Sequence, residues 1–255
     1  MEFSLEGPSA PKLMSITQLP DGTKIHWAPT PPRPKQSPLL VIGELLVTLG
    51  VLVGLFASYE VFIQDEVVGA KQTELAQEYG HEVAKSKFID PVKARTLGDI
   101  FGRMYVPRFG SEWTRLVAQG TRWHPVLNEI GVGHYNTSAL PGEVGNFAVA
   151  AHRGGFGGAF KNIHRLVEGD RVYLETNDYW YVYRYLQTKI VDPSDIAVID
   201  PVPAELDGAQ VGGHYMTMTS CTPIFVNTQR IVVWLELEKK ISVSEGAPKE
   251  LGLVN

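Results

Sequence analysis

The heptapeptide Tyr-Met-Thr-Met-Thr-Ser-Cys, residues 215–221, has the alternation of a half-buried β-strand. Successive side chains of a strand point to opposite faces of the sheet, so every second residue shares a face. One face then carries Met216, Met218 and Ser220, and the other carries Thr217, Thr219 and Cys221. The methionines indicate a core, and the threonine face indicates the wall of a polar groove that ends at a thiol.

Two further segments place polar side chains at strand ends. In the run Arg-Ile-Val-Val-Trp-Leu-Glu-Leu, residues 230–237, the alternate apolar residues form a core face and Arg230 lies on the opposite face. In the segment 146–152, His152 shares its face with Ala148 and Ala150, whose small side chains leave room for a substrate chain.

These three residue types suit nucleophilic attack on a carbonyl group. A thiolate attacks far better than a thiol, and a nearby cation or base lowers the cysteine pKa from about 8.5. A histidine, with a reference pKa near 6.5, can protonate a leaving amine and then deprotonate the next nucleophile. A positive donor at the developing oxyanion is commonly worth ~3–4 kcal/mol. Cys221, His152 and Arg230 are therefore the candidate catalytic residues.

From about Leu97 onward, the sequence pattern is typical of a small all-β domain. Short apolar runs at 104–106, 170–175 and 179–190 are separated by Gly, Pro, Asn and Asp. Many short strands at this spacing predict a closed or nearly closed β-barrel or sandwich. The segment 160–167 is the best candidate for a short helix inside this domain, which we expect to span residues 97–240.

An apolar segment at residues 39–63 precedes this domain. About 20 helical residues cross a bilayer core of roughly 30 Å, so the segment is long enough for a transmembrane signal anchor. It lacks the small-residue cleavage site of a removed signal peptide. Basic residues precede it and acidic residues follow it, which places the N-terminus in the cytoplasm and the C-terminal domain outside the cell.

The remaining segments have their own composition. The proline-rich composition of residues 1–38 predicts a disordered cytoplasmic leader. We expect residues 64–96 to form an extracellular stalk or helix and residues 241–255 to form a polar tail. The net charge of −5 over 255 residues includes no basic block, so no nucleic-acid footprint is present. Histidines and carboxylates do not cluster at ligand spacing, and we expect neither a metal site nor a cofactor.

Cys221 is the only cysteine of the chain, and it cannot form an internal disulfide. A lone cysteine is most often a buried small hydrophobe. In an exported chain, however, an unpaired cysteine is either an intermolecular link or a free reactive thiol. Spacing alone does not decide between these interpretations, because the chain holds seven histidines and several arginines.

The combined motifs resemble the sortase family. The matching elements, in chain order, are Tyr105-Val106-Pro107, Gly145-Asn146-Phe147, Ala151-His152-Arg153, Gly169-Asp170, the stretch from Thr217 to Thr222, and Arg230. The resemblance covers roughly residues 97–240. It implies a closed eight-stranded sortase-type β-barrel with short helices, preceded here by a single transmembrane helix.

The resemblance also implies the reaction. Cys221 would attack the Thr–Gly bond of an LPxTG/LAxTG-like C-terminal sorting signal on a secreted protein, and a thioacyl enzyme would form. An amine of a cell-wall precursor similar to lipid II would then resolve it. The segment Gly133-His134-Tyr135 looks like class E sortases of high-GC Gram-positive bacteria, which points to Tyr135 as a substrate contact beside the second signal residue. Thr217, Thr219 and Ser220 are the other substrate-binding candidates.

Two alternative functions stay open at this point. An exported cysteine peptidase would use water as the acceptor, although papain-like enzymes carry Cys before His and this chain has the reverse order. An L,D-transpeptidase would have a Ser-x-Gly-Cys signature, whereas Thr219-Ser220 precede Cys221 here. A non-catalytic exported binding module on a stalk is the other class, and slow reaction of Cys221 with alkylators would indicate it.

Overall fold

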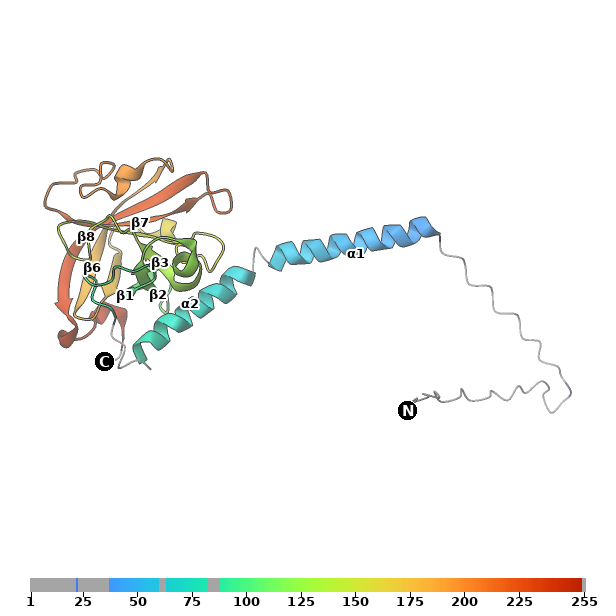
Figure 1. The fold of residues 1–255 in the computed structure, drawn as a ribbon, viewed down its shortest axis with the longest axis horizontal. Helices are drawn as coiled ribbons and strands as arrows, with labels where there is room; N and C mark the ends of the chain where they lie inside the picture. Colours follow the sequence, from blue (N-terminus) through green and yellow to red (C-terminus); the bar gives the residue numbers. More distant parts are fainter. Residues whose placement is uncertain (1–21, 23–36, 60–62, 82–87, 254–255) are drawn as a thin grey trace. The chain divides into compact units, whose positions relative to one another are not determined.

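The computed structural model describes residues 22, 37–59, 63–81 and 88–253, and its main body is a β-barrel (Figure 1). The eight strands are β1 (Ile100–Tyr105), β2 (Thr114–Gln119), β3 (Gly131–His134), β4 (Gly145–Ala150), β5 (Arg171–Glu175), β6 (Tyr179–Val191), β7 (His214–Thr222) and β8 (Gln229–Ser242). They close in the order β1-β2-β3-β4-β7-β8-β6-β5, which confirms the predicted eight-stranded barrel. Closure leaves no unpaired sheet edge.

Most neighbouring strands are antiparallel, but β2 pairs with β3 and β4 pairs with β7 in parallel. Parallel pairs need a long crossover, and the β4–β7 pair brings together segments about 70 residues apart, as Ala148 opposite Thr217 shows. Short helical segments lie in the connections between strands: η2 (Pro107–Phe109), η3 (Trp123–Ile130), η4 (Ile163–Arg165) and η5 (Ile196–Ile199). Two more, η6 (Val243–Glu245) and η7 (Lys249–Leu251), follow β8.

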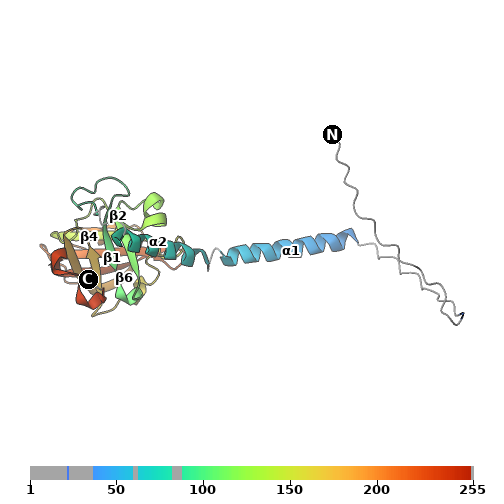
Figure 2. The same cartoon turned by 90° about the horizontal axis from the view of Figure 1, so that it is seen from below.

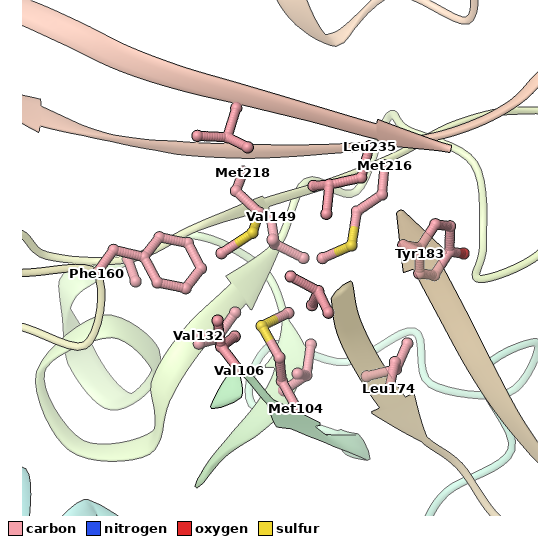
Figure 3. Packing of buried hydrophobic residues seen from close by; sticks show 14 of the residues in the cluster. Met104, Val106, Val132, Val149, Phe160, Leu174, Tyr183, Met216, Met218 and Leu235 are labelled. Carbon is pink, nitrogen blue, oxygen red and sulfur yellow. The ribbon is translucent and has the colours of Figure 1, made fainter. Parts of the chain in front are cut away.

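The barrel interior is a packed apolar core. Figure 3 shows side chains from several strands pointing toward one another, with Met216 and Met218 of β7 beside Val149 of β4. Both methionines are fully buried, as the alternation of residues 215–221 predicts. Because this packing fixes which face of β7 points inward, it also fixes where the strand ends and its polar residues lie.

Helix α2 (Gln64–His81) lies along the outside of the barrel beside β2 (Figures 1 and 2). Its contact with the loop after β4 is a close backbone approach at two glycines. A Cβ atom added to Gly157 would stand 2.9 Å from the amide nitrogen of Gly69, so a larger residue would push the helix away. The side-chain amide of Gln72 also donates to the carbonyl oxygens of Asn128 and Phe156, both at 3.2 Å.

Helix α1 (Pro38–Ser58) is predominantly apolar, with a mean hydropathy of 2.5 over its best 18-residue window and Glu44 as its one ionisable residue, and none of its residues is buried. Its 21 residues are long enough to cross a bilayer, so it is a possible membrane anchor. The contact pattern divides the chain at Gly50, and the barrel and α2 belong to the second unit, residues 51–255. The predicted leader, apart from residues 22, 37 and 38, lies outside the described residues.

Candidate functional site

Strand pairing brings the three candidate catalytic residues to one end of the barrel. In the β7–β8 ladder Cys221 is directly opposite Arg230. Strand β4 runs parallel to β7 on its other side, with Ala150 opposite Thr219. The register continues past β4, because the Ala151 N–H donates to the Thr219 carbonyl at 3.3 Å. His152 is the next residue, so it leaves β4 at the end of β7 that carries Cys221.

The thiol and the guanidinium are both half-buried and lack the partners that would lock them in place. Cys221 is a free cysteine. The Nη1 group of Arg230 donates to the carbonyl oxygens of Asn227 at 3.1 Å and Gln229 at 2.9 Å. Among the described residues, no carboxylate forms an ion pair with Arg230. A guanidinium has five N–H donors, so donors of Arg230 stay available to an oxyanion.

The His152 imidazole is held on one side only. Its Nε2 is hydrogen-bonded to the side-chain oxygen of Asn128 at 2.8 Å, and its ring contacts Phe156 and Trp123 at centroid distances of 5.5 and 6.2 Å. Burial lowers its pKa, and the negative charge of Asp65 partly opposes that shift. Nδ1 has no hydrogen-bond partner among the described residues.

A chain of hydrogen bonds on η3 sets the tautomer of His152. The Glu129 carboxylate can only accept, so it receives the proton of His124 Nδ1 at 2.9 Å. Nε2 of His124 then accepts from the Asn128 amide at 3.1 Å, which leaves the Asn128 oxygen to accept from His152 Nε2–H. His152 Nδ1 therefore carries the free lone pair. Sequence reasoning missed Asn128, because no spacing rule connects η3 to the end of β4.

The four predicted substrate-binding residues lie in different surroundings. Tyr135 is half-buried, and its hydroxyl is 3.0 Å from the Thr219 hydroxyl, two residues before the thiol. Thr217 is fully buried and donates to Asn146 at 2.8 Å. Ser220 is also buried, and it donates to the Ala151 carbonyl at 2.7 Å, which ties β7 to the start of the His152 loop. Only Tyr135 of the four has substantial exposed surface, and a substrate role for each stays a prediction.

A second arginine lies close to this end of the barrel. The guanidinium of Arg153 donates to the Thr222 hydroxyl, just beyond Cys221. Its Nε is buried without a partner among the described residues, and burial lowers its pKa. Arg153 therefore has a side-chain bond to the end of β7, whereas the Arg230 side chain donates to the carbonyl oxygens of Asn227 and Gln229.

This arrangement suits acyl transfer through the thiol. It combines a half-buried thiol, an imidazole whose Nε2 is bonded to Asn128, and a guanidinium that forms no ion pair with a carboxylate in the described part of the chain. The described residues contain no group of three or more His, Cys, Asp or Glu side chains placed to hold a metal ion.

The comparisons with known proteins agree on one family. The sortase domain family matches residues 104–238. Sortase SrtE2 of Streptomyces coelicolor is 34% identical over a match 223 residues long, which covers 83% of this chain and 87% of that protein. Sortase SrtE1 of the same organism is 30% identical, and the match covers 82% of this chain and 60% of SrtE1.

Solved structures agree with the barrel. Sortase E from Streptomyces avermitilis is 39% identical with a TM-score of 0.56, and the match covers 61% of this chain and 99% of that one. Sortase E1 from Streptomyces coelicolor, solved with a tripeptide in the active site, is 31% identical with a TM-score of 0.56. The match covers 60% of this chain and 96% of that one. The barrel, the match over residues 104–238 and the extent of these similarities show that the chain belongs to the sortase family, and it is most similar to class E members.

Proposed function

We propose that this sortase cleaves the Thr–Gly bond of an LPxTG/LAxTG-like C-terminal sorting signal and transfers the protein to an amine of a cell-wall precursor similar to lipid II. Sortases are cysteine transpeptidases that act on proteins with sorting signals and use cell-wall amines as acceptors. The proposal adds the particular signal, the bond cleaved and the acceptor, and it assigns the chemistry to Cys221, His152 and Arg230.

The observation that carries the proposal is the direct pairing of Cys221 with Arg230 across the β7–β8 ladder, beside the strand end that bears His152. Side chains of directly opposite residues in an antiparallel ladder lie on the same face of the sheet, so the Arg230 guanidinium is on the face that carries the thiol. Its positive charge is available to the oxyanion that forms when the sulfur attacks a carbonyl.

The reaction follows in two halves. The Cys221 thiol gives its proton to Nδ1 of His152 as its sulfur attacks the threonine carbonyl carbon, and donors of Arg230 stabilise the resulting oxyanion. The intermediate collapses with loss of the glycine amine, which takes a proton from His152, and a thioester remains. An incoming amine attacks the thioester, His152 removes its proton, and the thiolate departs. His152 Nδ1 suits both transfers because Nε2 is committed to Asn128.

We further propose that Tyr135 favours Ala over Pro at the second signal residue. The phenol lies beside Thr219, two residues before the nucleophile. It can accept a hydrogen bond from a backbone N–H of an alanine, whereas proline has none. Such a bond gives roughly 1 kcal/mol, enough for several-fold discrimination.

The anchor proposal is that α1 crosses the membrane with the N-terminus in the cytoplasm and residues 97–240 form the catalytic domain outside. The charge difference across residues 39–63 supports this orientation. Protease added to intact protoplasts should remove the barrel and leave the leader. Protection of the barrel would contradict the orientation and make a cell-wall substrate untenable.

The transfer itself is tested with the full chain in detergent or nanodiscs. Peptides with Leu-Pro-x-Thr-Gly or Leu-Ala-x-Thr-Gly are incubated with and without an amine, and the products are identified by mass spectrometry. We expect cleavage between Thr and Gly and a product joined to the amine. Cleavage at another bond, or release to water in the presence of saturating amine, would refute the proposed reaction.

A further inference from the structure

A polar pocket of about 290 Å³ lies between α2 and the loop after His152. Its walls include Asp65, Glu66, Thr73, Trp113, Arg115 and Lys161. The catalytic roles proposed above use none of these side chains. The pocket therefore needs its own explanation, and the charged residues in it point to a ligand.

Two oppositely charged side chains are buried in this pocket without pairing to each other. Asp65 and Arg115 are each only 5% exposed, and they form no ion pair. Oδ1 of Asp65 and Nε of Arg115 are buried and have no hydrogen-bond partner among the described residues. Burial lowers the pKa of Arg115 to about 10. Nη1 of Arg115 donates to the Thr73 hydroxyl at 2.5 Å and to the Thr114 carbonyl oxygen at 2.8 Å, so the unsatisfied atoms are its Nε and Asp65 Oδ1. Buried polar atoms without a partner cost free energy and are usually satisfied by a ligand, an ion or water.

The rim of the pocket repeats this pair of charges. Glu66 and Lys161 are exposed there, with 3.8 Å between the Lys161 ammonium and the Glu66 carboxylate. An anion alone would meet the carboxylates of Asp65 and Glu66, and a cation alone would meet Arg115 and Lys161. The charges suit a small group that carries an ammonium and a carboxylate close together, and the volume limits that group to about the size of an amino acid.

The pocket is connected to the catalytic histidine through the same loop. Phe156 contacts the His152 ring at a centroid distance of 5.5 Å, and its carbonyl accepts from Gln72 of α2. Gly157, the next residue, lines the pocket and makes the close backbone approach to Gly69. Asp65 is near enough for its charge to oppose the fall in the His152 pKa.

The pocket is also close in the chain to the apolar helix. Helix α1 ends at Ser58 and α2 begins at Gln64, so only five residues separate the possible anchor from the helix that carries Asp65. Seven residues of fully extended chain span at most about 25 Å, which limits the distance from Ser58 to Asp65. An acceptor attached to a membrane lipid could reach a site this near the anchor.

We propose that this pocket binds the amino-acid end of the acceptor, with its ammonium on Asp65 and its carboxylate on Arg115. This inference rests on the proposed function, because it identifies the acceptor class as amines that also carry an α-amino-carboxylate group. The bound end holds the acceptor in place, while a second amine of the acceptor attacks the thioester. Helix α2 is then part of the acceptor site as well as a connection to the barrel.

The test uses the full chain with Cys221→Ala in nanodiscs, where binding is measured without chemistry. Glycine is titrated by NMR against the protein, with N-acetylglycine lacking the ammonium and glycinamide lacking the carboxylate. We expect saturable binding of glycine, and binding at least about tenfold weaker for each blocked analogue, because each loses one charged hydrogen bond. Equal binding of all three probes, or no saturable binding of glycine, would overturn the proposal.

Substitutions then locate the site. Asp65→Asn and Arg115→Gln should each weaken glycine binding about tenfold, whereas Arg171→Gln, which breaks an exposed ion pair with Glu238, should leave it unchanged. If either buried variant unfolds, glycine binding is measured instead in Lys161→Gln, which changes an exposed residue and should weaken binding about threefold. Unchanged binding in the folded variants would refute the assignment. Glycine binding is measured without forming a thioester. The binding result would therefore still test the pocket if the native chain failed to catalyse transpeptidation.

Discussion

Two histidines of neighbouring strands, His134 and His152, differ in how completely their rings are bonded. His134 ends β3 and is 1% exposed, and both of its ring nitrogens have partners. The Nδ1 atom is 2.8 Å from the side-chain oxygen of Gln119, and the Nε2 atom is 3.1 Å from the Ala139 carbonyl oxygen. His152 follows β4 and is half-buried, and only its Nε2 is bonded. Burial lowers the pKa of both rings, that of His134 to about 4.

The difference separates a structural histidine from a reactive one. The buried His134 ring has a pKa of about 4 and is neutral near pH 7, so Nδ1–H can donate to Gln119 while Nε2 accepts from the Ser138 hydroxyl at 3.0 Å, and the ring joins β3 to the loop at Ser138. A ring with one nitrogen fixed and the other free has a defined tautomer and a lone pair for proton transfer. Burial alone does not distinguish the two, whereas the partner of the second nitrogen does.

The largest expected effect comes from removing the reactive ring. His152→Ala should lower transpeptidation by roughly a hundred- to ten-thousandfold, because general acid–base catalysis is lost. Its thermal midpoint should stay near that of the native chain, since only one hydrogen bond disappears. The measurement is turnover with a sorting-signal peptide and amine, alongside a thermal melt.

His134→Ala is the matched control for that variant. It should lose about 2–4 kcal/mol of stability, because a buried ring and its hydrogen bonds are removed, while the folded fraction keeps its turnover. The comparison would fail if His134→Ala lost turnover as a stable protein, or if His152→Ala retained it.

The next effect concerns the charge opposite the thiol. Arg230→Lys keeps the charge but loses the planar pair of donors, so we expect turnover to fall by roughly two to three orders of magnitude with peptide binding partly kept. Steady-state kinetics should therefore show a larger change in kcat than in KM. Full activity in Arg230→Lys would make Arg230 structural and leave Arg153, bonded to Thr222, as the next candidate.

A third effect is the pH dependence of stability that His134 causes. Its pKa is about 4 in the folded chain and near 6.5 in the unfolded chain, so between these values the unfolded state binds the extra proton. Stability should therefore fall as the pH drops from about 6.5 to 4, by on the order of 3 kcal/mol, and be fully present above pH 6.5. Thermal melts across this range should be flatter for His134→Gln than for the native chain. Parallel curves would show that the ring does not carry this dependence.

The smallest expected effect concerns signal choice. Tyr135→Phe should reduce the preference for Ala over Pro signals several-fold, because the hydroxyl beside Thr219 is lost. Tyr135→Ala should reduce it at least as much. The measurement is the ratio of kcat/KM for the two peptides. An unchanged ratio in both variants would assign Tyr135 to packing.

Sequence reasoning succeeded where a strand has one buried and one polar face. The alternation of residues 215–221 predicted the buried methionines of β7, although Thr217 and Thr219 on its polar face are buried as well. The repetition of such strands predicted a barrel or a sandwich, and the resemblance to sortases selected the closed barrel. It missed β2, because the sequence Thr-Arg-Leu-Val-Ala-Gln of residues 114–119 shows no alternation of apolar and polar side chains. It also missed β3, which has four residues of which two are glycine.

The polar partners of the site were harder to predict. Asn128 reaches His152 from η3, 24 residues earlier in the chain, and Asp65 reaches the same region from α2. Such contacts depend on how α2 and η3 pack on the barrel, which involves the close approach of Gly69 and Gly157. Local patterns contain no information on packing between distant segments, so the sequence could nominate the strand-end residues but not their supports.

The most direct test of the central claim is the intact mass of the full chain after brief exposure to a sorting-signal peptide without amine. The account predicts one added acyl group, mapped to Cys221, which disappears when amine is added and never forms in Cys221→Ala. An acyl group on another residue, or transfer that persists in Cys221→Ala, would contradict the account.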